Sequence, residues 1–245
     1  MRFTLLISVI MCAFSSVSAQ GSDHYYFMGY VYSKNGNNVN VHHPYITVLL
    51  SLASEPEQII AARMSDPRGE FNFDGINIDL KRDYLFTVLL PNGKKRQYRC
   101  PGGDVKFSPG NINVHLCIGT HDISTSYYTK RNIEFDKKTG FFSKKPNLFD
   151  QIAQNAGLTR NGTDFWRDKD EATMVLFLQR FLPPDMLTRL VGVMKPVLIT
   201  SVTLVELVQP NDYFGGALYI ELVDEMKERM GLQMIEIHGS LEEVN

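Results

Sequence analysis

The sequence predicts a chain of mixed fold class, with an all-β seven-stranded antiparallel sandwich followed by an α+β domain. Two observations lead to this prediction. Between residues 25 and 118, short runs rich in β-branched and aromatic residues alternate with turn-forming clusters, and no long helical period interrupts them. After residue 147, helix-like segments precede strand-like segments, an order typical of α+β domains rather than of repeated βαβ units.

The expected sandwich strands follow one another closely, and turn residues separate them. An Asn-Gly pair at 35–36 follows the first strand, and Pro91 opens the turn before the sixth. Before the fourth strand, Asp66 can cap a turn and Gly69 can take a left-handed conformation. Alternation then directs Phe71 and Phe73 to the core. The strands are expected at 25–33, 45–52, 58–64, 70–73, 84–90, 95–99 and 111–118.

Four segments of this half resemble the carboxypeptidase regulatory-like, transthyretin-like domain of exported bacterial proteins. They are Gly29-Tyr30-Val31, Pro44, residues 66–73 with their D-x-x-G-x-F-x-F pattern, and residues 84–88. The resemblance implies a β-sandwich that contains no catalytic residues, so it assigns no site here. Residues 39–43 are bulkier than the family's usual small, Pro/Gly-rich segment.

Residues 1–19 have the pattern of a secretory signal peptide. Arg2 is followed by an apolar run at 3–14 and by small residues that end in Val17-Ser18-Ala19. The alternative is a membrane anchor, but this run is shorter than the ~20 residues that span a bilayer. We therefore expect export to the periplasm, the outer-membrane periphery or the cell surface, and no transmembrane helix after cleavage. The sandwich domain would then cover residues 20–118.

Two cysteines, Cys100 and Cys117, follow the predicted cleavage site. In an oxidising compartment such a pair is a candidate disulfide, and each cysteine lies in or beside an expected strand. Two free thiols are the alternative.

Residues 119–146 are expected to form a linker in which basic residues alternate with aromatic ones. A connector with solvated lysines is the simplest interpretation. Exposed aromatic residues here and beyond are also candidate contact residues, because aromatic side chains are enriched at interface hot spots. The candidates are Tyr127, Tyr128, Phe141 and Trp166.

The C-terminal domain, residues 147–245, is expected to begin with a helix at 147–156 that Gly157 ends. A loop that contains Trp166 is expected at 162–168. Further helices are expected at 170–182, 185–193 and 224–230, and strands at 197–208, 216–223 and 233–238. The segments 199–206 and 213–222 are similar to the end of TonB-dependent receptor plug domains, which implies a receptor-associated, plug-like fragment.

The sequence contains no motif that specifies a catalytic activity. Neither a nucleophile elbow nor a paired metal-ligand spacing is present, and the net charge of −2 argues against nucleic-acid binding. His115, His121 and Asp122 are a weak candidate metal set. We therefore expect a non-enzymatic exported protein, without a cofactor, that binds another envelope protein or a glycan. The alternatives are a metal-dependent hydrolase and the plug-like fragment.

Overall fold

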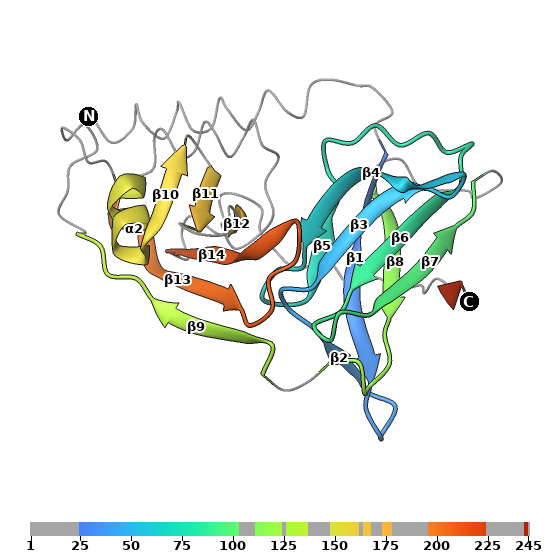
Figure 1. Ribbon diagram of the computed structural model, residues 1–245, viewed down its shortest axis with the longest axis horizontal. Coiled ribbons are helices and arrows are strands. Elements are labelled where there is room, and N and C mark those ends of the chain that lie inside the picture. Colours follow the sequence, from blue (N-terminus) through green and yellow to red (C-terminus); the bar gives the residue numbers. More distant parts are fainter. Residues whose placement is uncertain are drawn as a thin grey trace.

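The computed structural model describes residues 25–102, 111–123, 126–136, 148–161, 164–167, 173–177, 196–223 and 243–244. Its strands form three sheets. Two of them face each other as a sandwich, and the third lies beside it with a helix on its outer side (Figure 1). The predicted class, a β-sandwich followed by an α+β part, is confirmed.

The first sandwich sheet is built around β1 (Tyr26–Lys34). This strand pairs antiparallel with β2 (Asn40–His42) and β5 (Glu70–Asn72). On its other side it pairs in parallel with β8 (Asn111–Cys117), so one pair of the sandwich is not antiparallel. The short strand β2 falls in the bulky segment at 39–43 and was not predicted.

The second sandwich sheet is antiparallel throughout. Its order is β15-β7-β6-β3-β4. The bounds are β3 (Thr47–Leu52), β4 (Glu55–Met64), β6 (Tyr84–Leu89), β7 (Lys95–Cys100) and β15 (Glu243–Val244). Apart from β15, these strands lie within a few residues of their predicted positions.

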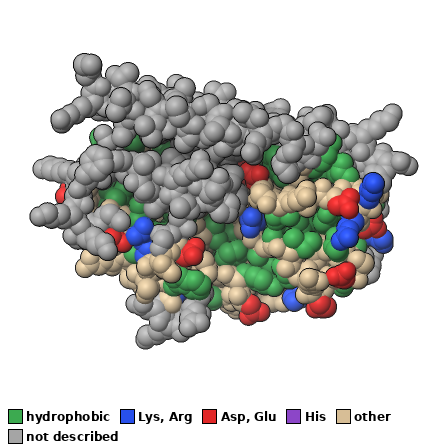
Figure 2. Space-filling model, turned by 90° about the horizontal axis from the view of Figure 1, so that it is seen from above, with side chains coloured by type: hydrophobic (Ala, Val, Ile, Leu, Met, Phe, Trp, Pro, Cys, Tyr) green, Lys and Arg blue, Asp and Glu red, His purple; other side chains and the backbone are tan. Residues whose placement is uncertain are grey.

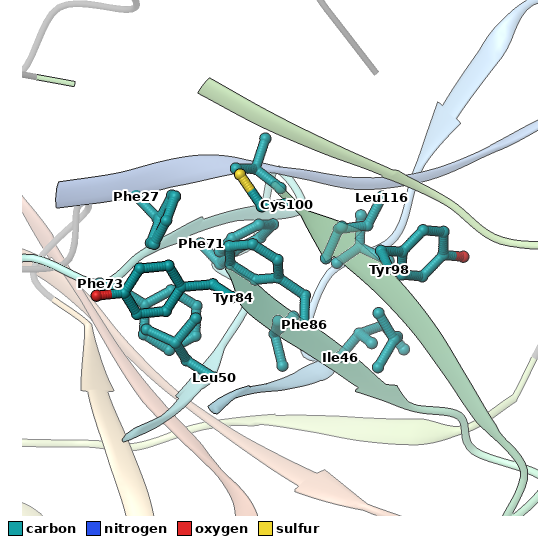
Figure 3. Close-up of a cluster of buried hydrophobic side chains, with 14 of the residues drawn as sticks. Phe27, Ile46, Leu50, Phe71, Phe73, Tyr84, Phe86, Tyr98, Cys100 and Leu116 are labelled. Carbon is teal, nitrogen blue, oxygen red and sulfur yellow. The ribbon is translucent and has the colours of Figure 1, made fainter. Parts of the chain in front are cut away.

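Aromatic side chains from both sheets fill the sandwich core (Figure 3). Phe86 is fully buried, and its ring centroid lies 4.9 Å from that of Phe27 and 6.0 Å from that of Phe73. The predicted turn before β5 is confirmed as well. Asp66 accepts hydrogen bonds from the backbone N–H groups of residues 68 and 70, and Gly69 has a φ of 81°.

The third sheet has the order β10-β11-β12-β14-β13-β9. One of its faces packs against a helix and the other against the sandwich. The helix α2 (Leu148–Ala156) covers one face through Phe149 and Ile152. The other face packs Val205 and Ala217 against Tyr45 and Met64 of the sandwich. The strands are β9 (Tyr128–Asn132), β10 (Leu158–Asn161), β11 (Asp164–Arg167), β12 (Thr173–Phe177), β13 (Ile199–Leu207) and β14 (Phe214–Leu222), with the 3-10 turn η1 (Pro196–Leu198) before β13.

Two secondary-structure predictions for this half were wrong. The helix expected at 170–182 contains β12, which pairs in parallel with β14. Its apolar run lies between two other strands, and such a run cannot be assigned to helix or strand by periodicity alone. The loop expected at 162–168 contains β11. In addition, β9, which lies within the expected linker, pairs with β13 at the edge of this sheet.

The remaining predictions of this half divide into two groups. The helix at 147–156 and the strands at 197–208 and 216–223 are confirmed, and Gly157 ends the helix with a φ of 71°. The segments 185–193, 224–230 and 233–238, like the signal peptide, lie outside the described residues. None of the described helices is long and apolar enough to cross a membrane.

The predicted disulfide is also wrong, because Cys100 and Cys117 are both free thiols. The alternation of the two strands explains this. Cys100 is buried in the sandwich core, whereas Leu116 fills the core position of β8 and Cys117 therefore points to the other face of its sheet. Spacing along the sequence does not reveal this difference in orientation.

Candidate functional site

A cavity lies among the described residues where the sandwich meets the third sheet, and we call it the junction pocket. Its volume is about 260 Å³. Sandwich residues from the start of β3 and from the β6–β7 turn line one side, and the β13–β14 turn lines the other. The size is slightly below the ~300–1,000 Å³ of typical small-molecule sites. The pocket therefore suits a small ligand or the end of a longer one.

Buried tyrosines form the floor of the junction pocket. Tyr45 is 2% exposed and Tyr127 is 8% exposed, and desolvation by burial raises the pKa of both hydroxyls well above the ordinary value. The Tyr127 hydroxyl donates a hydrogen bond to the backbone carbonyl of Pro44 at 2.7 Å. Both rings are therefore held as neutral, rigid surfaces.

Tyr45 occupies an unusual backbone conformation. Its φ is 61°, a value that bulky residues rarely adopt and that typically costs ~1–3 kcal/mol. Its ring packs edge-on against Tyr128 at 4.9 Å, and the Lys130 ammonium lies 5.5 Å from its centroid. Backbone strain of this kind is concentrated at functional sites, so the conformation of Tyr45 indicates that the junction pocket is a functional site.

Asn211 fixes the opposite wall of the pocket. Its side-chain oxygen accepts hydrogen bonds from the backbone N–H groups of Tyr213 and Phe214, both at 3.0 Å. Its side-chain amide donates to the hydroxyl of Thr47 at 2.9 Å, across the junction between the two halves. This one residue therefore shapes the β13–β14 turn and fastens it to the sandwich.

The rim of the pocket is polar and more accessible than the floor. Gln209, Asp212, Lys94 and Lys95 are exposed, and Tyr213 is half-buried. The rim thus offers amide, carboxylate, ammonium and phenol groups above an apolar floor. A ligand with one apolar face and several hydroxyl groups matches this arrangement.

The structure gives the predicted contact residues different surroundings. Tyr127 was predicted to be exposed and is instead buried, although it lines the pocket. Tyr128 does not line the pocket and packs against Tyr45. Trp166 is half-buried in β11 of the third sheet and does not line the pocket. Phe141 lies outside the described residues.

The candidate metal set does not assemble. The Asp122 carboxylate accepts hydrogen bonds from Arg96 at 3.0 Å and from the backbone N–H of Gly119 at 2.9 Å. His115 lies near Tyr30 and Tyr32 on the outer face of its sheet, whereas His121 is exposed in the following turn. Across the part of the chain that the structure describes, no three His, Cys, Asp or Glu residues form a metal-ligating group.

The lining residues that sequence reasoning missed come from two turns. Asn211, Asp212 and Tyr213 lie between the strands expected at 197–208 and 216–223, and Lys94 lies between those expected at 84–90 and 95–99. None of the four was predicted to be a contact residue. The Pro-Asn-Asp pattern predicts a turn. Nothing in it indicates which distant segment the turn faces.

Comparisons with known proteins find distant structural neighbours only. No family model matches the chain, and no curated protein matches it. One similar structure, from Pseudomonas aeruginosa, is described as "a putative carbohydrate binding protein", with 13% identity and a TM-score of 0.29 over 42% of this chain and 94% of that one. An (S)-allantoin synthase has 10% identity and a TM-score of 0.28 over 44% and 45%, respectively. The plantain pollen allergen Pla l 1 has 11% identity and a TM-score of 0.26 over 42% and 98%.

Proposed function

We propose that this chain is an exported, non-enzymatic binding module that takes a saccharide in the junction pocket. The observation that carries the proposal is the combination of a rigid floor containing Tyr45 and Tyr127 with a rim of exposed polar groups. Export rests on the signal-peptide pattern of residues 1–19.

A sugar ring suits this pocket because each of its faces carries C–H groups while its edge carries hydroxyls. The C–H face would pack on the half-buried ring of Tyr213 or on the tyrosine floor, since tyrosine provides a large apolar surface with one polar end. The hydroxyls would bond to Gln209 and Asp212, which can donate and accept, respectively. The two exposed lysines would favour a sugar that carries a carboxylate.

Binding is favoured over catalysis because the described residues that line the pocket include no Ser, Cys or His. Asp212 is the only carboxylate among the described residues that line it, whereas glycoside hydrolysis ordinarily requires a pair. The regulatory-like resemblance of the sandwich supports the same conclusion, since it implies a module without catalytic residues.

A glycan array, followed by calorimetry on the selected saccharide, tests this proposal. We expect Tyr213→Ala and Asp212→Asn each to weaken binding at least ~10-fold, because each removes a direct contact in a small site. Asp164→Asn is the matched control, since Asp164 is an exposed aspartate in β11 away from the pocket. Binding that Asp212→Asn and Asp164→Asn change equally, or an array without any bound saccharide, would refute the proposal.

A further inference from the structure

The last described segment, β15, lies on the outer edge of the second sandwich sheet. Glu243 is registered opposite Tyr98 and Val244 opposite Gln97, in an antiparallel pair with β7. More than one hundred residues of sequence separate these partners. Without β15, β7 would be the edge strand of the sheet, because its other side is already paired with β6.

An edge strand exposes backbone N–H and C=O groups that can pair with another chain, and proteins commonly cover such edges. Here the cover is short, because β15 has two residues and β7 has six. Such a short pairing contributes few hydrogen bonds. A longer extended segment in the same register could replace it.

The charges of the edge indicate which segment would fit. The turn and strand at 94–99 contain Lys94, Lys95, Arg96 and Arg99, and all of these except Arg96 are exposed. Arg96 and Arg99 are paired with Asp122 and Asp83, which holds their side chains in place. The covering segment is acidic, with the sequence Leu-Glu-Glu-Val-Asn at 241–245. The edge is therefore basic and the sequence of its cover is acidic, a combination that favours their pairing.

We propose that the β7 edge is a strand-addition site for an extended acidic peptide of a partner protein, and that residues 243–244 occupy it in its absence. The inference does not rest on saccharide binding, although Lys94 and Lys95 belong both to this edge and to the rim of the junction pocket. Main-chain hydrogen bonds would provide the affinity, and the basic residues would select an acidic segment. The intramolecular segment competes with the partner, because its tether gives it a high local concentration.

The test measures binding of a fluorescent peptide, Gly-Ser-Leu-Glu-Glu-Val-Asn, to the full chain and to two double variants. Glu243→Pro with Val244→Pro removes the amide donors that keep the internal segment paired. Glu243→Ala with Val244→Ala keeps these donors and is the matched control. We expect the proline variant to bind the peptide about 10-fold more tightly than the other two, given a local concentration of ~1 mM and a peptide Kd of ~0.1 mM.

Two further peptides separate strand addition from charge attraction. A peptide N-methylated at the residues equivalent to 243 and 244 keeps its charges and loses the ladder donors, so it should not bind. A peptide with lysine in place of both glutamates should bind at least several-fold more weakly. Equal binding of the plain and N-methylated peptides, or no gain in the proline variant, would overturn the proposal. A concentration-dependent dimer of the wild-type chain that the proline variant loses would also overturn it, since the edge would then belong to a second copy.

Discussion

The hydrogen bond between Asn211 and Thr47 provides the sharpest test of how the two halves are joined. It connects residues 164 positions apart in the sequence, from the β13–β14 turn to the start of β3. We consider three chains: Asn211→Ala, Thr47→Val and the double variant. Thr47→Val is the more conservative change, because valine keeps the shape of the side chain and removes only the hydroxyl.

The magnitudes follow from the number of bonds that each change removes. Asn211→Ala removes three hydrogen bonds, two to the turn and one to Thr47, and each is worth about 1 kcal/mol net. We therefore expect a loss of about 3 kcal/mol in the free energy of unfolding. Thr47→Val removes only the shared bond and should cost about 1 kcal/mol. The double variant should lose about 3 kcal/mol rather than 4, because the shared bond can be lost only once.

Urea denaturation followed by tyrosine and tryptophan fluorescence measures these quantities. The coupling energy, near 1 kcal/mol, is the decisive value. Strictly additive losses would show that the two side chains do not interact, and our account of the junction would then be refuted. Saccharide binding measured on the same chains adds a second readout, since a displaced turn would also move Tyr213 out of the pocket.

Three further predictions follow from single residues. Burial raises the pKa of the Cys100 thiol from 9.0 to about 11, so Cys100 should react with a thiol reagent roughly 100-fold more slowly in the folded protein than in urea. The half-buried Cys117 should react faster than Cys100 in the folded protein. Mass spectrometry of the labelled peptides measures both, and equal labelling of the two cysteines would contradict this prediction. Desolvation lowers the pKa of His43, whose ring nitrogen lies 2.8 Å from the Ser33 hydroxyl, so stability should be complete above the ordinary pKa of 6.5 and decrease as the pH falls below it. Thermal melts should show a smaller decrease for His43→Gln, and an unchanged pH profile would count against the assignment. Phe86→Ala should destabilise the sandwich by about 3–5 kcal/mol, because the ring is fully buried among other aromatic rings, and Phe86→Leu should cost clearly less. Urea titration measures both losses, and a loss below 1 kcal/mol for the alanine variant would contradict this packing.

The charge distribution on one face of the molecule agrees with the low net charge of the chain. Figure 2 shows acidic and basic side chains intermixed at the sandwich end of this face. The ion pairs of the sandwich include Arg82 with Asp79 at 3.6 Å and Arg99 with Asp83.

Sequence patterns predicted the turns, the inward-facing strand positions and the end of one helix, because neighbouring residues determine these features. The turn at Asp66 and Gly69 and the inward position of Phe71 and Phe73 follow from side-chain chemistry and two-residue alternation, and both were confirmed. The helix that ends at Gly157 was confirmed for the same reason. In contrast, residues 173–177 were predicted as helix because the apolar run did not show that strands would lie on both sides of it.

The candidate sites were decided by tertiary structure. Neighbouring residues do not determine that Asn211 would meet Thr47, that Tyr127 would line a pocket from within an expected linker, or that residues 243–244 would cover the edge of β7. The two cysteines illustrate the same limit, because their separation in sequence permitted a disulfide while the faces of their strands prevented it. By itself, the sequence determined which segments alternate apolar and polar residues, which form turns and which carry charge, since these properties depend on residues a few positions apart. Which surfaces meet depends on the packing of sheets from distant parts of the chain, and only the folded structure contains that information.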